Sequence, residues 1–268
     1  MKVCWKCFIV CLFFVSILGY AEFFIVSPSY NNNLYYKDNL ESIFSQTNKA
    51  WKLCYIDDCS EDKTGELVTE YVQKRGMQDK CLVICNKVRQ GAMANIYHAI
   101  HTYCSPEDIV VCLDGDDMFY DNTVLQTLAD IYSDPSVWIT HGSCKQLSTG
   151  KRKVNSFSYT KKIMRKRLFR KVFWYGDHIR SFYAKLFQKI LKKDLMFEGK
   201  FFQMTYDMAI MFPMLEMASQ GHIRYVKRFM LLYNDCTQIN DHKVNLRLQQ
   251  AMDEHIRSLP KYKPLKHL

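Results

Sequence analysis

The run IVVCLDGDD at residues 109–117 decides how this sequence is read. Its five apolar residues are typical of a strand buried on both faces of a parallel sheet. Three carboxylates follow within four residues, and grouped like charges repel each other. Asp114 and Asp116 flank Gly115, which permits unusual backbone angles, so the two carboxylates can converge on a divalent cation. The run therefore predicts a buried strand that ends at a cation site.

A helix-capping turn is the alternative for these acidic residues. Asp121 or Asn122 could cap the next helix alone, which leaves Asp114 and Asp116 unexplained. Asp117 stays open as a cation ligand, a partner of a ligand or a helix-start residue.

Three further apolar runs precede this strand, and helix-like segments separate them. This alternation is the pattern of a parallel sheet built from βαβ units. We therefore predict an α/β fold with a Rossmann-like, mostly parallel sheet flanked by helices. The expected strands are residues 23–27, 52–56, 81–85 and 109–113, and the expected helices lie near residues 36–47, 62–75 and 92–103.

The second half of the chain is less regular, and we expect residues 22–130 and 131–268 to form two halves of one domain. The predicted elements are helices at residues 122–132, 179–191, 205–219 and 242–256, and strands at residues 137–141 and 223–226.

The net charge of the 268-residue chain is +10, but it is concentrated in one segment. From Lys151 to Lys171 there are ten Lys and Arg and no Asp or Glu, so the rest of the chain sums to zero. This distribution argues against general nucleic-acid binding and for one local anionic partner, such as a phosphate-bearing acceptor or anionic lipid headgroups. A solvated charged surface is the alternative.

Residues 1–21 read as a signal peptide or membrane anchor, because Lys2 and Lys6 precede a run of about a dozen apolar residues. The alternative is an apolar extension before the first strand. The eleven Cys show no second pair at zinc-finger spacing, and several lie in apolar runs, so buried free thiols are expected.

Polar clusters follow three of the predicted strands. Ligands of open parallel sheets bind beyond the carboxyl ends of the strands. Four segments, VSPSYN at 26–31, YIDDCSEDKT at 55–64, GAMAN at 91–95 and LDGDD at 113–117, resemble family 2 glycosyltransferases of the GT-A fold in order and spacing. The resemblance covers residues 23 to about 130.

The resemblance implies a donor site for a nucleotide-sugar. Pro28, Tyr30, Asp57 and Asp58 match the parts that bind the nucleoside, although the two acids could instead cap a helix. Asn95 matches a segment beside the nucleotide and could contact the donor, cap or pack.

The same resemblance implies a metal site. Asp114 and Asp116 match the two acids of the family's DXD motif, which hold Mn²⁺ or Mg²⁺ against the donor diphosphate, and Asp114 therefore also counts among the donor contacts. His242 is a candidate third ligand, and a solvated helix-start histidine is its alternative.

An inverting transfer needs a base for the acceptor hydroxyl. Asp207 matches the second acid of the family's frequent Glu-Asp pair, but Tyr206 replaces the first. Glu198 and Glu216 are alternative bases. His178 is expected on the acceptor side or on a surface loop.

We therefore expect a metal-dependent, inverting glycosyltransferase. A UDP-sugar is the favoured donor, and a glycan, a lipid-linked molecule or a protein is the acceptor. A nucleotidyltransferase would carry more Gly and basic residues after the first strand, and a catalytically silent binding protein is the third reading. The leader implies export or membrane association, whereas nucleotide-sugars are generally made in the cytosol, so a place on the cytoplasmic face stays open.

Overall fold

The structure of this chain is a computed structural model that describes residues 22–268 except 177 and 238–244. The expected leader and His242 lie outside the described residues. Among the helices of the described part, none is both long and apolar enough to cross a bilayer.

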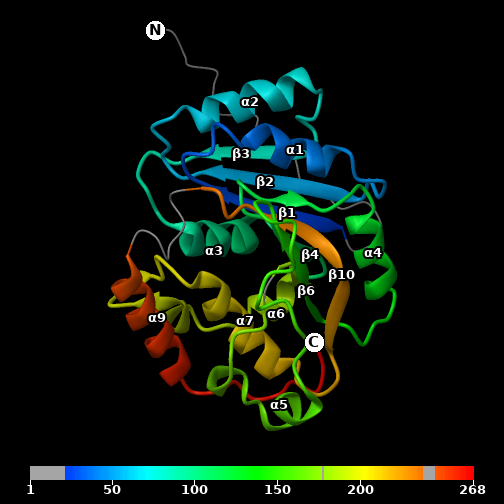
Figure 1. Cartoon of the computed structure of the whole chain (residues 1–268), viewed down its shortest axis with the longest axis vertical. Coiled ribbons are helices and arrows are strands. Elements are labelled where there is room, and N and C mark those ends of the chain that lie inside the picture. The colour runs from blue at the N-terminus through cyan, green and yellow to red at the C-terminus, as the bar shows by residue number, and fades with distance from the viewer. Residues whose placement is uncertain (1–21, 177, 238–244) are drawn as a thin grey trace, which may run out of the picture.

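An eight-stranded sheet forms the centre of the molecule, in the order β3-β2-β1-β4-β7-β6-β10-β5 (Figure 1). β7 is antiparallel to both of its neighbours and β5 is antiparallel to β10, whereas the other pairs are parallel. The predicted α/β class and mostly parallel sheet are confirmed. The strands are β1 Phe23–Ser29, β2 Trp51–Asp57, β3 Cys81–Cys85, β4 Ile109–Cys112, β5 Met118–Phe119, β6 Ile139–Gln146, β7 Arg180–Tyr183 and β10 Ile223–Tyr233.

Helices cover both faces of the sheet. One layer contains α1 Tyr36–Phe44, α2 Thr64–Lys74 and α4 Val124–Tyr132. The other layer contains α3 Ala92–Tyr103, α6 Ala184–Phe187, α7 Tyr206–Met217 and α9 Leu246–Ser258. The short segments α5 Lys161–Lys166, η1 Phe169–Lys171 and η2 Lys192–Leu195 and the hairpin of β8 Met196–Phe197 with β9 Lys200–Phe201 complete the chain.

The central strands are buried on both faces because their side chains alternate between two hydrophobic clusters. Phe24 and Val26 of β1 pack against the α3 and α7 layer, whereas Phe23 and Ile25 pack against the α1 and α4 layer. Burying a large apolar side chain stabilises the fold by roughly 1.5–3 kcal/mol relative to its exposed state. The alternation therefore makes the apolar runs the main source of stability.

One predicted element is wrong. Residues 179–191 were expected to form a helix, but Arg180–Tyr183 is a strand, and only Ala184–Phe187 after it is helical. A short run with apolar residues fits the helix and strand periods equally well. Pairing with β4 and β6 decides the outcome, because it satisfies the backbone of a segment buried in mid-sheet.

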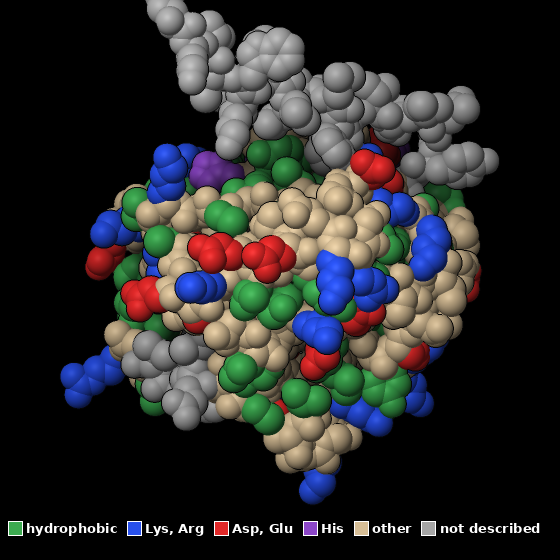
Figure 2. Space-filling model, turned by 90° about the horizontal axis from the view of Figure 1, so that it is seen from above, with side chains coloured by type: hydrophobic (Ala, Val, Ile, Leu, Met, Phe, Trp, Pro, Cys, Tyr) green, Lys and Arg blue, Asp and Glu red, His purple; other side chains and the backbone are tan. Residues whose placement is uncertain are grey.

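The outer surface over α1 and α2 carries charges of both signs. Viewed from above in Figure 2, acidic and basic side chains are interspersed on this face. Glu66 and Lys74, at the two ends of α2, illustrate the mixture.

Candidate active site

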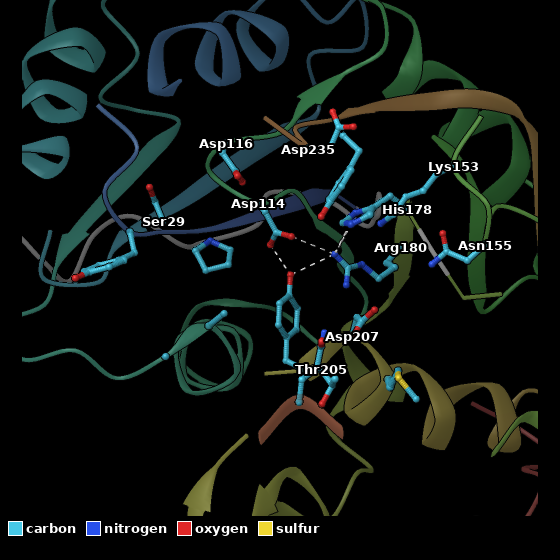
Figure 3. Close-up of a pocket in the computed structure, with 18 of the residues that line it drawn as sticks. Ser29, Asp114, Asp116, Lys153, Asn155, His178, Arg180, Thr205, Asp207 and Asp235 are labelled. Carbon is cyan, nitrogen blue, oxygen red and sulfur yellow. Dashed lines mark hydrogen bonds and ion pairs between the residues drawn. The ribbon is translucent and has the colours of Figure 1, made fainter. Parts of the chain in front are cut away.

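A cavity of about 820 Å³ opens at the carboxyl ends of β1, β2 and β4. β1 lies between β2 and β4. The connection through α1 leads from β1 to β2, whereas the connection through α3 leads to β4 on the other side of β1. The loops that follow β1 and β4 therefore diverge at this edge of the sheet and leave a crevice between them. The first turn of α7 forms the opposite wall (Figure 3).

The acidic turn after β4 approaches the end of β1 closely. A Cβ atom on Gly115 would lie 2.6 Å from the Cβ of Ser29. The Gly115 N–H donates to the carbonyl of Pro28 at 3.0 Å. Gly115 does not adopt a positive φ. The expected reason for a glycine here was therefore wrong, since the close approach requires it and unusual backbone angles do not.

Asp117 is buried in this turn, with 1% of its surface exposed. Its Oδ1 accepts from the N–H of Asn234 at 2.8 Å, whereas its Oδ2 has no hydrogen-bond partner. Burial first, and then the charges of Asp116 and Asp114, raise the pKa of Asp117 well above its usual range. A cation at Oδ2 would give this oxygen a partner and would offset the repulsion among the three carboxylates.

Asp114, Asp117 and His178 form a three-residue cluster. Each presents one ligand atom, and these atoms lie within 4.8 Å of one another. Burial, Arg180 and Lys153 lower the pKa of His178 well below its usual value, so its imidazole is neutral, as a metal ligand must be. The cluster therefore has the donor set of a divalent cation site.

The structure differs here from the predicted ligand set. It places Asp117 and His178 beside Asp114, whereas we expected Asp116 and the undescribed His242. Asp116 lines the cavity, and burial together with Asp114 raises its pKa to about 7. Its metal role stays a prediction. His178 was expected on the acceptor side or on a surface loop; it is 5% exposed and lines the cavity, so the surface loop was wrong, and a place on the acceptor side stays a prediction.

Arg180 is a buried cation that the sequence analysis missed. Its Nη2 lies 3.4 Å from Asp114 Oδ2, 3.2 Å from the hydroxyl of Tyr206 and 3.0 Å from His178 Nδ1. Tyr206 also donates to Asp114 Oδ1, and Arg180 Nε has no hydrogen-bond partner. A guanidinium keeps its charge even when buried. No sequence signal marked it, because the four residues of β7 carry no clear period and were expected to be helical.

Asp207 stands in the first turn of α7, facing the same cavity (Figure 3). The indole N–H of Trp174 donates to its Oδ2 at 2.9 Å, and the Trp174 ring packs edge-on against Phe212. The carboxylate is therefore held in one orientation. The alternative base Glu216 is buried in an ion pair with Arg170, away from the cavity.

The remaining predicted donor residues lie around the other side of the cavity. Pro28, Tyr30, Asp58 and Asn95 all line it, and the Arg89 guanidinium lies 3.7 Å from the centre of the Tyr30 ring. This flat pair at the rim suits a base or a ribose.

Asp58 and its neighbour differ in position. Asp58 accepts from the backbone N–H groups of Gln90 and Gly91 at 2.9 and 2.8 Å, which fixes the start of α3. Burial raises the pKa of Asp58, but hydrogen bonds from Asn95 and the residue 86–91 loop outweigh it, and the net shift is downward. Asp57 does not line the cavity and accepts from the N–H of Ser60 at 3.2 Å. Donor contacts by these two acids stay predictions.

Residues 24–194 match the family model described as glycosyl transferase family 2. This chain belongs to that family. The match includes β1 to β4, the acidic turn and β7, so it extends well beyond the segments that carried the resemblance in the sequence.

Two curated relatives align with parts of the chain. The putative teichuronic acid biosynthesis glycosyltransferase TuaG of Bacillus subtilis is 34% identical over 47 residues, which are 18% of this chain and 19% of TuaG. The bifunctional glycosyltransferase pgtA of Dictyostelium discoideum is 27% identical over 115 residues, which are 42% of this chain and 15% of pgtA. The chain thus spans less than a fifth of each of these relatives.

Solved structures share the fold. S. aureus TarS superposes with a TM-score of 0.60 at 16% identity, covering 80% of this chain and 36% of TarS. TarS 1–349 in complex with UDP-GlcNAc superposes with a TM-score of 0.59 at 15% identity, covering 81% of this chain and 59% of that structure. The mannosyltransferase PcManGT from Pyrobaculum calidifontis, in complex with GDP-Man and Mn²⁺, superposes with a TM-score of 0.52 at 16% identity. This match covers 78% of this chain and 55% of PcManGT. The GT-A fold expected from the sequence is therefore confirmed.

Proposed function

We propose that this family 2 chain transfers a sugar from a nucleotide-sugar to an acceptor hydroxyl, with a divalent cation and with inversion at the anomeric carbon. One observation carries the proposal. The cluster of Asp114, Asp117 and His178 shares a single cavity with Asp207, whose carboxylate Trp174 orients.

The acidic turn is the part of the cavity that suits the donor diphosphate. Asp117 Oδ2 is a buried oxygen without a hydrogen-bond partner, 3.9 Å from Nε2 of the neutral His178, so these residues fit Mn²⁺ or Mg²⁺. When bound, the cation supplies charge stabilisation to the departing diphosphate. The UDP-GlcNAc and GDP-Man complexes of the neighbours support a nucleotide-sugar, with a UDP-sugar favoured.

Arg180 adds a second positive charge at the same place. Its guanidinium contacts Asp114 and His178, so a cation in the cluster and Arg180 would repel each other across a few ångströms. A diphosphate bound between the cation and Arg180 would remove this repulsion and would accept a hydrogen bond from Arg180 Nε, which has no partner in the protein. Arg180 therefore binds the leaving group in the proposed reaction.

Asp207 is the proposed base. It takes the proton of the acceptor hydroxyl as the hydroxyl oxygen attacks the anomeric carbon from the side opposite the diphosphate. Trp174 holds its Oδ2, and the adjacent Tyr206 bonds to Asp114 on the donor side. In the proposed reaction, the base and the leaving group lie on opposite sides of the transferred sugar.

Lys151, Arg152 and Lys153 line the cavity, and the charge of Lys153 acts on Asp117 and His178. This basic wall suits a phosphate, either that of the donor or that of a phosphate-bearing acceptor among the glycan, lipid-linked and protein alternatives.

Release of nucleoside diphosphate from UDP-GlcNAc and from GDP-mannose, with Mn²⁺ and with EDTA, tests the proposal. We expect metal-dependent release, and Asp207→Asn should lower its rate by about 10²–10⁴. Glu198→Gln, outside this cavity, is the matched control. Wild-type turnover by Asp207→Asn would overturn the base assignment, and unchanged turnover by Asp116→Asn together with Asp117→Asn would overturn the metal site.

A catalytically silent binding protein remains the second candidate, because Tyr206 stands where the family has a Glu and binds Asp114. Nucleotide binding without release of diphosphate under any condition would favour it. Formation of a nucleoside triphosphate from a nucleotide-sugar and pyrophosphate would instead indicate a nucleotidyltransferase.

A further inference from the structure

The short helix α5 lies at the end of the molecule opposite α2 (Figure 1), and it is rich in basic residues. α5 contains no buried residue, and four of its six residues are cations exposed to solvent: Lys161, Lys162, Arg165 and Lys166.

The C-terminal segment lies beside α5. Arg167 Nη1 donates to the carbonyl of Tyr262 at 2.7 Å, and Lys161, Arg165 and Pro264 line the same hollow of about 350 Å³. The segment adds three exposed lysines, although about 100 residues separate it from α5. The two segments form one surface, the basic face, which consists of Lys161, Lys162, Arg165, Lys166, Lys261, Lys263 and Lys266.

The structure divides the basic run between Lys151 and Lys171 into parts with different positions. Its first three residues line the cavity, and Arg170 is buried against Glu216. Only the middle of the run, α5, faces solvent as a group. The sequence predicted an anionic partner along the whole run, whereas the structure leaves only α5 as an exposed site for such a partner. The C-terminal lysines enlarge this site.

Nearby acids do not neutralise this face. Asp194 accepts from the hydroxyl of Tyr262 at 2.6 Å, and Glu216 accepts from Arg170 and from the N–H of Tyr262. Within the described part of the chain, no cation of the basic face forms a salt bridge. The face over α1 and α2 is different, because charges of both signs are mixed there (Figure 2).

Most of the net charge of the chain lies on the basic face. The seven cations of the basic face carry +7 of the net charge of +10 of the whole chain. A protein whose net charge is concentrated on one face is oriented in the field of an anionic surface.

We propose that the basic face docks on the phosphates of an anionic phospholipid bilayer. Its cations are spread over a convex helix and an extended segment, which suits a plane of headgroups. Half-buried apolar side chains, among them Met164 and Leu265, lie between the cations. The hollow beside Lys161 and Arg165, with Met164 and Pro264 in its wall, has room for one headgroup. Few aromatic residues lie among the cations, so a single-stranded nucleic acid fits this face poorly.

Co-sedimentation of the full chain with two kinds of vesicle tests the proposal. One kind contains phosphatidylcholine alone, and the other contains phosphatidylcholine and phosphatidylglycerol at about 7:3. We expect binding to the anionic vesicles that weakens steeply as salt is raised, because exposed charges are screened. Lys161, Lys162, Arg165 and Lys166 changed together to Gln should lower the partition coefficient by about two orders of magnitude.

The matched control changes four exposed lysines at the other end of the molecule to Gln, namely Lys37, Lys63, Lys74 and Lys87. It removes the same net charge and should lower binding by less than about threefold, since these lysines are farther from the membrane than a Debye length. The apolar run at residues 7–18 is present in every variant, so differences among them report on the basic face.

Three outcomes would overturn the proposal. They are equal binding to both kinds of vesicle, equal losses in the α5 variant and the control, and release of bound protein by millimolar inorganic phosphate. Tight binding of an RNA oligonucleotide with no binding to vesicles would also overturn it, and would assign the face to nucleic acid. Thermal melting of both variants checks that the fold is intact.

Discussion

Two buried arginines show how differently this fold treats the same side chain. Arg170 is 4% exposed and makes a bidentate pair with Glu216, with its Nε 2.7 Å from Oε1 and its Nη2 3.0 Å from Oε2. Its Nη1 donates to the carbonyl of Ile256 at 2.5 Å. Arg180 is 2% exposed, but its Nε is unpartnered, and its nearest carboxylate, Asp114, is 3.4 Å away.

The difference separates a structural charge from a functional one. Arg170 is satisfied by the protein itself and joins η1, α7 and α9. Arg180 is held in place by β7 but is only partly satisfied, so a ligand can improve its surroundings. An incompletely paired buried cation at the rim of a cavity therefore indicates binding more strongly than burial alone does.

Arg170→Gln should produce the largest change in stability. It leaves the Glu216 charge buried without its partner, so the free energy of unfolding should fall by about 3–5 kcal/mol. Urea denaturation followed by circular dichroism measures this change. A loss below about 1 kcal/mol would show that the pair contributes little to the fold.

Asp116→Asn should raise the free energy of unfolding, and the size of this gain should depend on pH. In the metal-free protein the pKa of Asp116 is raised to about 7, so the folded state retains a proton that the unfolded chain loses near its ordinary value. Stability should therefore fall as pH rises from about 4 to 7, and at pH 8 the penalty is fully present. Because Asp116 is partly exposed to the cavity, we expect a gain of about 1–3 kcal/mol for the variant at pH 8.

Urea denaturation in EDTA at pH 4 and pH 8 measures this dependence. The gain should be small at pH 4, where the folded wild type is protonated and the unfolded chain is about half protonated. An equal gain at both pH values would contradict the assigned ionisation.

Arg180→Lys should separate binding from stability. It keeps the charge but loses the guanidinium fork, so the affinity for a nucleoside diphosphate in EDTA should fall about tenfold, or about 1.4 kcal/mol. Affinity for the nucleoside alone should change little. Isothermal titration calorimetry gives both values, and Arg224→Lys at an exposed ion pair with Asp134 is the control. Equal losses for both ligands would mean that Arg180 only supports the fold.

Trp174→Phe should have the smallest effect. It removes the hydrogen bond to Asp207 but keeps an aromatic ring against Phe212. A hydrogen bond to a charged group contributes about 1.5–3 kcal/mol, and water replaces part of it in a cavity, so kcat should fall about three- to tenfold with KM for the donor unchanged. A rise in KM alone would place Trp174 in donor binding instead.

Local patterns predict the first half of the fold well. Four strands and three amphipathic helices follow directly from apolar runs and turn residues, because each segment carries its own periodicity. β7 could not be predicted in this way. Its four residues carry no clear period, and only the partners supplied by β4 and β6 determine its conformation.

The candidate site shows the same limit. Asp114 and Asp207 were predicted from motifs and line the cavity. The positions of Asp117, His178 and Arg180 depend on contacts between residues up to 117 apart in the chain, which no spacing rule contains. Tyr206 was noted only as a departure from the family pattern, whereas the structure gives it a bond to Asp114.

The bond between Tyr206 and Asp114 also ties the proposed base to the acidic turn. Tyr206 is fixed to Asp114 through its side-chain hydroxyl, and Asp207 is the next residue, so one peptide unit and the Tyr206 side chain connect the proposed base to the acidic turn. Displacement at a single carbon needs the entering and departing groups on opposite sides of that carbon. This connection runs through the start of α7 and not through a movable loop, so a one-residue insertion after Tyr206 would shift Asp207 relative to the acidic turn while leaving both side chains present.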